Sequence, residues 1–313
     1  MAQLSDLPKI FRSPGVVTMA RRVWREVGDD SLLVWAAAMA YSWLFAIFPF
    51  VLFLMSLLPY LPEDTKTAAK TEMREVVYKW APGPAAATIW DNVSNILSKP
   101  HGGLLGIGLL LTLWGASGGV NMTINALDKC YEIEGGRPFY KQRPIAIGLT
   151  IVVAVLVLIV LALLPVGTIA IHWIEARSHP IISTPLYWIW RIVRYPLAVL
   201  LMFATINVIY HFGPSIRQKY HFFTPGAMFV VAVWMLLAVS FRFYVERYGK
   251  YNETYGTVGG VAILLLLFYF DAVVLLVGAE INSEIDYEVL KVARGSRDFR
   301  SRLQPAQTMD LNG

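Results

Sequence analysis

The chain has 313 residues, of which 56% are apolar and only 16% charged, and its formal net charge is +5. Soluble domains carry about 25% charged residues, and one hydrophobic core could not enclose the apolar surplus, which gives a mean hydropathy of +0.53. These values exclude an ordinary soluble domain and favour a membrane protein. The single cysteine, Cys130, excludes a disulfide framework and a cysteine-based metal site.

Six windows of the sequence meet the requirement for a membrane-spanning helix, which is about 20 mostly apolar residues. They cover residues 32–58, 103–127, 145–174, 186–210, 224–244 and 257–281. Thr224 and Pro225 open the fifth window as an N-cap and a first helical residue. We therefore predict an all-α polytopic membrane helix bundle with about six transmembrane helices over residues 32–283, preceded by a basic N-terminal segment, residues 1–31.

Residues 59–101, between the first two windows, form a segment that is too long for a bare connection. Apolar residues recur in it at helical spacing, as at Met73, Val77 and Trp80, and a Pro-Gly-Pro break at 82–84 interrupts the pattern. We expect two amphipathic helices that lie on the outer membrane face or cover the bundle there. A plain connecting domain packed on its own helices is the alternative.

The distribution of Lys and Arg predicts the orientation of the chain. Five of these residues precede Ser31, four lie between the second and third windows, and five lie in the tail, residues 284–313. Cytoplasmic segments of membrane proteins are enriched in Lys and Arg, so we predict that both termini lie in the cytoplasm, below a bacterial inner membrane. The polar, basic tail is expected to be disordered.

Several stretches together match the pattern of one family. They are Ala38-Met39-Ala40-Tyr41, Leu113-Trp114-Gly115-Ala116-Ser117, Pro225-Gly226-Ala227, Tyr251-Asn252-Glu253-Thr254-Tyr255-Gly256 and Gly278-Ala279-Glu280-Ile281-Asn282. On these motifs, residues 15–287 resemble the YihY/BrkB family of bacterial inner-membrane proteins, whose members are often mislabelled ribonuclease BN. The resemblance implies six spans with both termini inside. Because one relative is linked to movement of lipid A precursors across the inner membrane, it also implies envelope-lipid transport.

A charged residue, Asp271, lies near the centre of the sixth window, where an aspartate is costly and is a functional candidate by default. The expected neighbours at the same depth are Tyr41 and Ser42 of the first window. Asp271 either belongs to a polar pathway or makes a protonated, hydrogen-bonded contact between helices. The resemblance adds that this position departs from an apolar family pattern.

A second polar feature consists of Asn121, Asn125 and Asp128. Their i, i+4, i+7 spacing puts the three side chains on one face of the second helix. They form either the polar wall of a cytoplasm-facing vestibule, where a lipid headgroup or an ion binds, or an interhelical packing face with amide hydrogen bonds.

A third feature is a group of arginines on the outer side. Arg191 and Arg194 enter the fourth window, and Arg242 lies late in the fifth. These side chains either extend to the outer membrane interface or line a groove that grips an anionic headgroup.

The motif residues of the sixth window are expected to have a structural role. Tyr255 and Gly256 belong to a predicted tight turn at its entry, where glycine permits close packing. Gly278, Glu280 and Asn282 lie at its inner end, and we expect Glu280 at the membrane interface, paired with a cytoplasmic Lys or Arg.

No catalytic constellation accompanies these features. The five histidines share no metal-ligand spacing, and the sequence contains no glycine-rich phosphate loop. We therefore predict that the chain is not an enzyme and binds no metal, cofactor or nucleic acid. The leading function is transport or flipping of an amphiphilic, anionic envelope component such as a lipid, with membrane lipids as partners. The alternative is a non-transporting scaffold for envelope-biogenesis proteins. The sequence does not indicate an oligomeric state.

Overall fold

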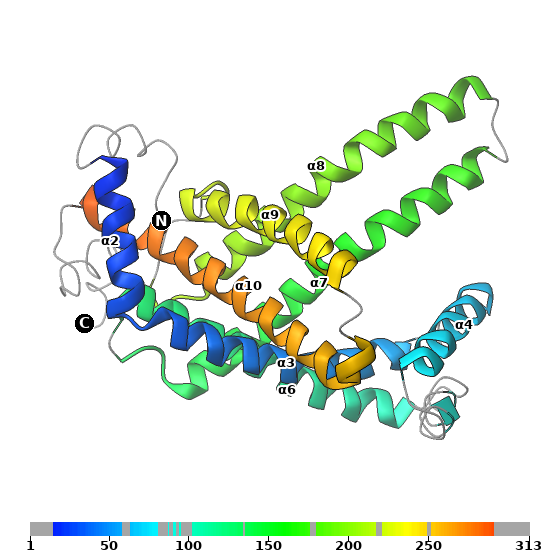
Figure 1. Cartoon of the computed structure of the whole chain (residues 1–313), viewed down its shortest axis with the longest axis horizontal. Coiled ribbons are helices and arrows are strands. Elements are labelled where there is room, and N and C mark those ends of the chain that lie inside the picture. Colours follow the sequence, from blue (N-terminus) through cyan, green and yellow to red (C-terminus); the bar gives the residue numbers. More distant parts are fainter. Residues whose placement is uncertain are drawn as a thin grey trace, which may run out of the picture.

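The computed structural model describes residues 15–57, 63–80, 102–133, 135–175, 180–216, 221–248 and 252–290, together with 87, 90, 91 and 94. All regular structure in this part of the chain is α-helical, which confirms the predicted all-α class (Figure 1). The helices are α2 (Val16–Asp29), α3 (Leu32–Leu57), α4 (Glu63–Trp80), α6 (Gly102–Cys130), α7 (Phe139–Glu175), α8 (Pro180–Phe212), α9 (Pro225–Tyr248) and α10 (Asn252–Leu290).

Helices α3 and α6 to α10 fall on the six apolar windows of the sequence. Among the described residues, three segments are long and apolar enough to cross a membrane: 139–160 of α7, 192–212 of α8 and 260–289 of α10. Helices α2 and α3, which meet at an angle of 65°, add a fourth crossing if the pair forms one span. A membrane helix bundle is therefore confirmed, and the count of six spans stays a prediction.

Helix α2 lies within the basic N-terminal segment and is too short and too polar for the 20-residue criterion. Its amphipathic pattern leaves Trp24 79% exposed and buries an apolar face formed by Met19, Val23 and Val27. Arg22 Nη1 donates to Glu288 Oε2 at 2.9 Å and so ties α2 to the last turns of α10. Because α10 continues to Leu290, the predicted start of the tail at residue 284 falls inside a helix.

Helix α4 is one of the two amphipathic helices expected between the first two windows. It covers the first half of the 59–101 segment and lies beside the far end of α3 (Figure 1). The second expected helix falls largely outside the described residues.

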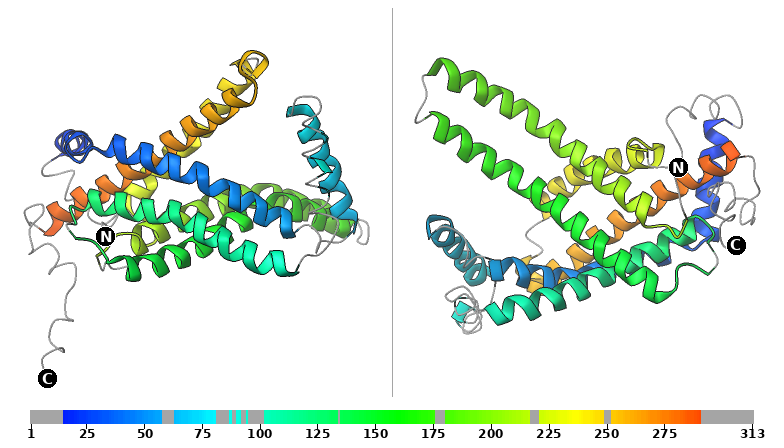
Figure 2. Two further views of the ribbon diagram at one scale, coloured as in Figure 1. Left: turned by 90° about the horizontal axis from the view of Figure 1, so that it is seen from below. Right: turned by 180° about the vertical axis from the view of Figure 1, so that it is seen from behind.

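The buried core lies at one end of the bundle, which carries the α6–α7 and α8–α9 loops and which we call the loop end. Large, fully buried side chains gather there from several helices: Met39 of α3, Leu127 of α6, Tyr210 of α8 and Leu275 of α10. Toward the other end, α7 and α8 run side by side and diverge from α3, α6 and α10 (Figures 1 and 2). The close packing of the loop end makes it the place where side chains of many helices can form a site.

Two glycines let α9 and α10 approach closely at the loop end. A Cβ on Gly226 would collide with the carbonyl oxygen of Gly278, and one on Gly278 would lie 2.9 Å from the carbonyl oxygen of Gly226. Asn282 Oδ1 accepts the Gly226 N–H at 2.8 Å. Thr224 Oγ1 accepts the Ala227 N–H at 3.3 Å, which confirms Thr224 as the N-cap of this helix.

Contacts between side chains set the register of α3, α6 and α10. Trp43 of α3 donates from Nε1 to Thr123 Oγ1 of α6 at 3.1 Å, and its ring meets Phe268 of α10 edge-on, with centroids 6.2 Å apart. Closer to the loop end, Cys130 Sγ lies 3.7 Å from Leu276 O. Trp43 thus puts Thr123 of α6 level with Phe268 of α10, and the second contact puts Cys130 level with Leu276. The residue numbers of the two helices differ by about 145 in both pairs, so residue 271 of α10 is level with residue 125 of α6.

Candidate functional site

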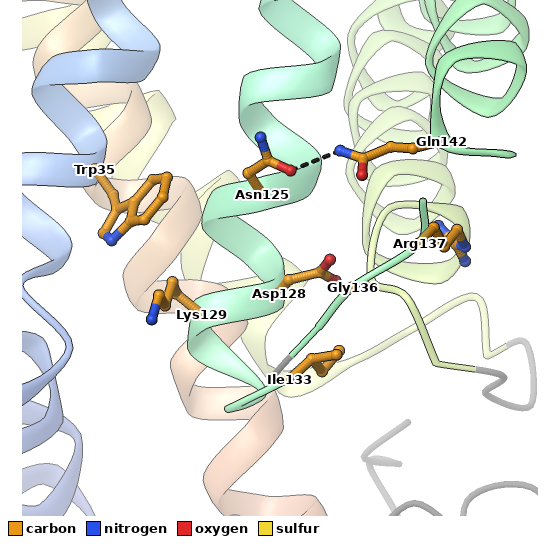
Figure 3. A pocket seen from close by; sticks show the side chains of 8 residues that line it. All are labelled: Trp35, Asn125, Asp128, Lys129, Ile133, Gly136, Arg137 and Gln142. Carbon is orange, nitrogen blue, oxygen red and sulfur yellow. Dashed lines mark hydrogen bonds between the residues drawn. The ribbon is translucent and has the colours of Figure 1, made fainter. Parts of the chain in front are cut away.

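A pocket of about 300 Å³ opens at the loop end, between α3, α6, the α6–α7 loop and the start of α7 (Figure 3). It is lined by Trp35 of α3, by Asn125, Asp128 and Lys129 of α6, by Ile133, Gly136 and Arg137 of the loop, and by Gln142 of α7. Its volume is at the lower end of the range for small-ligand pockets. Asn125 and Asp128, two of the three residues of the predicted polar face, therefore border one cavity.

Asn125 and Gln142 join α6 to α7 across the pocket. Gln142 Nε2 donates to Asn125 Oδ1 at 2.6 Å, and Figure 3 shows the two side chains pointing toward one another. Gln142 is buried and Asn125 is half-buried, so this bond lies at the wall of the pocket. Asn125 thus makes an amide contact between helices and also borders the pocket, and a cytoplasm-facing vestibule stays a prediction.

Asp128 connects the pocket wall to the α8–α9 loop. Its Oδ1 accepts the Ser215 N–H and its Oδ2 accepts the Ser215 hydroxyl, each at 2.6 Å. The residue is buried, and a Cβ on Gly136 would lie 2.6 Å from Oδ2, so only glycine fits beside the carboxylate without a shift. Because the carboxylate is engaged with Ser215, Asp128 positions the loops around the pocket.

Arg137 binds the end of α8. Its guanidinium donates to Phe212 O at 3.2 Å, to Gly213 O at 2.9 Å and to Pro214 O at 2.7 Å, which satisfies carbonyls that the helix leaves free. Burial lowers the pKa of this guanidinium, and the nearby Asp128 carboxylate opposes the effect by raising it. Arg137 remains a cation at physiological pH, and its positive charge stabilises the C-terminus of α8.

Lys129 and Trp35 form the opposite side of the pocket. Figure 3 shows Lys129 on the side of α6 that faces away from Arg137, the side on which Trp35 of α3 also lies. Lys129 is exposed, so its ammonium is available to an anion that enters the pocket. The pocket therefore combines an exposed cation, two amides and an indole ring.

Asn121, the remaining member of the predicted polar face, lies one turn of α6 away from Asn125. It does not line the pocket. Its Oδ1 is buried, and no group among the described residues bonds to it. The polar face thus continues beyond the pocket toward the middle of the bundle.

Asp271 and Tyr41 lie apart from the pocket. By the register of the helices Asp271 is level with Asn125, but it belongs to the face of α10 that carries Gly278 and Asn282, which meet α9. Tyr41 is 61% exposed and packs against the Phe45 ring at 4.7 Å, on the outward side of α3. A joint pathway through these two residues stays a prediction.

Of the three predicted outer arginines, only Arg194 has its side chain in the described part of the structure. Its Nη2 donates to Tyr195 OH at 2.9 Å, and its Cζ lies 4.8 Å from the centroid of that ring. The side chains of Arg191 and Arg242 lie outside the described part of the structure. Arg194 is on α8, and the pocket has no lining residue from that helix.

The motif residues of α10 fall in two places. Tyr255 and Gly256 lie in its first turns, so the helix begins before the predicted entry turn, and their side chains are outside the described part. Gly278, Glu280 and Asn282 are buried at the loop end. Glu280 is fully buried among the described residues, and its place at the level of the membrane interface stays a prediction.

Three residues of the site are not singled out by spacing rules. Gln142 of α7 and Ser215 of the α8–α9 loop form hydrogen bonds to α6. In the sequence, Arg137 is recognisable only as one of the positive charges that predict the orientation, and not as a partner of Pro214. Among the described residues, no three His, Cys, Asp or Glu side chains gather into a group that could hold a metal ion.

The family model described as Virulence factor BrkB matches residues 23–302 of the chain. The chain belongs to this family. Its apolar helices and its similarity to UPF0761 membrane proteins agree with a multi-pass membrane protein. The BrkB model covers every residue that lines the pocket.

Three relatives of this BrkB-family chain show the extent of the similarity. The ribonuclease-like protein YfkH of Bacillus subtilis (strain 168) is 30% identical over 253 residues, which cover 79% of this chain and 88% of YfkH. A UPF0761 membrane protein of Xanthomonas axonopodis pv. citri (strain 306) is 25% identical over 286 residues, and one of Stenotrophomonas maltophilia (strain K279a) is 22% identical over 276. In both cases the match covers 86% of this chain and 61% of the relative's length. No solved structure matches the chain.

Proposed function

We propose that the chain transports or flips an amphiphilic, anionic envelope component such as a lipid, and that the pocket at the loop end receives its headgroup. One observation carries the proposal: a polar pocket with the cation Lys129 lies at the end of a bundle of long apolar helices. The headgroup of such a molecule needs hydrogen-bond donors and positive charge. Its chains need an apolar surface nearby.

Helix α6 supplies that apolar surface beyond the pocket. Leu110 and Trp114 lie on the same face of the helix as Asn121 and Asn125, and they are 69% and 55% exposed. Asn125 follows Trp114 by 11 residues, or about 16 Å of helix at 1.5 Å per residue. A lipid whose headgroup enters the pocket would therefore have room for its chains along α6.

The proposal places the pocket on the cytoplasmic side of a bacterial inner membrane, because the loop end carries the predicted cytoplasmic segments. Both termini would then lie in the cytoplasm. Membrane lipids are the proposed partners.

The alternative is a non-transporting scaffold for envelope-biogenesis proteins. The exposed face of α2, with Val17 and Trp24, favours this role, because exposed apolar side chains of this size often mark an interaction surface.

The name of YfkH contains the words ribonuclease-like. We do not extend that activity to this chain, to which the proposal assigns no catalytic function, cofactor or nucleic-acid partner. A ribonuclease activity that co-purifies with the protein through successive columns would contradict this part of the proposal.

Flipping can be measured in proteoliposomes that contain NBD-labelled phosphatidylglycerol, with dithionite to quench the outer leaflet. We expect quenching beyond the outer leaflet only when the protein is present. The triple variant Asn125→Leu, Lys129→Gln, Gln142→Leu should slow flipping about tenfold or more, because it removes the donors and the cation offered to the headgroup.

Thr205→Val is a suitable control, since the Thr205 hydroxyl donates to Leu201 O within α8 and is remote from the pocket. It should flip at the wild-type rate. A wild-type rate in the triple variant would contradict the role of the pocket. Absence of flipping in the wild type, together with capture of envelope-biogenesis proteins through α2, would favour the scaffold.

A further inference from the structure

The polar face of α6 extends beyond the pocket as a stripe that lies against α7. Its positions 114, 117, 121, 125 and 128 follow one another at intervals of three or four residues, so they share one side of the helix. Hydrogen bonds from Gln142 to Asn125 and from Arg143 to the Trp114 carbonyl show that this side faces α7. We call these five positions with Gln142 and Arg143 the α6–α7 seam.

Arg143 extends along the seam away from the loop end. Its Cζ lies 4.1 Å from the centroid of the Trp114 ring, and its Nη2 donates to Trp114 O at 2.5 Å. Trp114 precedes Asp128 by 14 residues, which corresponds to about 21 Å along α6. Arginines near the ends of membrane helices normally extend toward water. The Arg143 guanidinium instead lies against the part of α6 that belongs to the second apolar window.

This guanidinium has no acidic partner among the described residues. Its Nε is buried and bonds to no group in that part of the chain. The Trp114 carbonyl, its acceptor at Nη2, also accepts the Ser117 hydroxyl at 2.9 Å. A guanidinium has five N–H donors and always carries its charge, so the N–H groups of Nη1 and the second N–H of Nη2 are left for another molecule. A cation among apolar helices is costly, and neither the Trp114 carbonyl nor the Trp114 ring cancels its charge, so an anion would lower this cost.

The seam is accessible from the side at the level of this guanidinium. Trp114 is exposed, and so are Leu110 and Leu111, one turn farther from the loop end. The anion can therefore arrive from the apolar surface of the bundle, where lipid would be. A second polar group, Asn121, lies on the same stripe with its Oδ1 buried and unbonded within the described residues. A 180° flip of this amide would put its Nδ2, which is a hydrogen-bond donor, at the place of Oδ1.

We propose that the α6–α7 seam binds the phosphate of an anionic phospholipid through the Arg143 guanidinium, with the acyl chains over Leu110 and Trp114. The planar guanidinium matches two phosphate oxygens at once. The inference deepens the proposed function, on which it rests for its part in transport, because it names phospholipids as the substrate class. The seam and the pocket would be successive stations for the same headgroup along α6.

The binding test uses the full chain in detergent, titrated with dioleoylphosphatidylglycerol, with dioleoylglycerol (which lacks the phosphate) or with inorganic phosphate. The rise of the melting temperature (Tm) with concentration gives an apparent Kd for each. We expect phosphatidylglycerol to raise Tm more than dioleoylglycerol does. Arg143→Gln should weaken phosphatidylglycerol binding roughly tenfold or more, because a charge-assisted contact is lost.

Lys141→Gln is the matched control, because it removes the same charge from an exposed residue two positions earlier in α7. It should change the Kd by about twofold at most. Equal affinities of Arg143→Gln and the wild type would overturn the proposal. An equal rise of Tm with inorganic phosphate would overturn the assignment to a lipid and indicate a soluble anion.

A second measurement needs only the wild-type protein and so does not depend on how a variant folds. Phosphatidylglycerol with a diazirine in one acyl chain should label the peptide that contains residues 110–114, and dioleoylphosphatidylglycerol should compete. Labelling confined to other helices would overturn the site.

The two proposals can fail separately. If Arg143→Gln loses phosphatidylglycerol binding but flips at the wild-type rate, the binding site stands and its role in transport is refuted. If binding is unchanged in Arg143→Gln while the pocket variant still slows flipping, the seam is refuted and the proposed function stands.

Discussion

Asp128 joins the end of α6 to the α8–α9 loop with both oxygens of its carboxylate, which accept the Ser215 N–H and the Ser215 hydroxyl. Asp128→Ala would remove both bonds and leave the Ser215 N–H without its acceptor. An unsatisfied polar group of this kind costs about 1–3 kcal/mol. We therefore expect the free energy of unfolding to fall by about 2–3 kcal/mol, which a lower Tm of the purified protein would reveal.

Ser215→Ala keeps the N–H bond to Asp128 and removes the hydroxyl, which donates to Asp128 and accepts the Arg137 N–H at 3.2 Å. It should therefore lower the free energy of unfolding by about 1–2 kcal/mol. An unchanged Tm in Asp128→Ala would show that the carboxylate does not stabilise this junction.

Spacing along one helix is enough to predict part of the site and not the rest. Asn125 and Asp128 are recognisable because polar residues recur at helical intervals within an apolar window. Gln142 and Ser215 lie 17 and 87 positions from the residues they contact, and nothing in their local sequence marks the contact. Arg143 is visible in the sequence as a positive charge, but only the packing of α7 on α6 directs it along the seam.

Close contact of α9 with α10 depends on Gly278. In Gly278→Ala the new Cβ would meet the Gly226 carbonyl oxygen at 2.9 Å and collide with a side chain of α9. Overpacking of this kind typically costs about 1–3 kcal/mol, so we expect a lower Tm. Gly148→Ala in α7 is the control, since a Cβ there meets nothing within 4 Å and alanine favours the helix. If both variants had the wild-type Tm, close packing at Gly278 would not be needed.

Hydropathy predicts the long helices because each contains about 20 apolar residues in succession. It misses α2, because this helix is apolar on one face only, where Met19, Val23 and Val27 are buried, and polar elsewhere. It also ends α10 too early, because Asp286 and Glu284 are polar but buried beneath neighbouring helices. Burial of polar residues is a property of packing, which a window average cannot register.

The arrangement of the helices gives the bundle two unlike ends. At the loop end, α2, α3, α6, α8, α9 and α10 share one core, while the far halves of α7 and α8 diverge from the others (Figures 1 and 2). The windows do not predict this, because the choice of neighbours depends on contacts such as Trp43 to Thr123. The pocket lies in the packed part, and the seam leads from it along α6. A headgroup route along α6 would thus start at the packed end of the bundle and lead to an exposed part of the helix.

The orientation of these two ends can be tested with single cysteines. Cys130 is buried, and replacing it by serine provides a background without a native thiol. Trp24→Cys then reports on α2 at the loop end, and Tyr78→Cys reports on α4 at the other end, since both native side chains are exposed. Because the loop end carries the clusters of Lys and Arg, a membrane-impermeant maleimide should label position 78 in spheroplasts and position 24 in inverted membrane vesicles. The reverse labelling would put the pocket outside the cytoplasm, so that a headgroup would enter it from the outer leaflet.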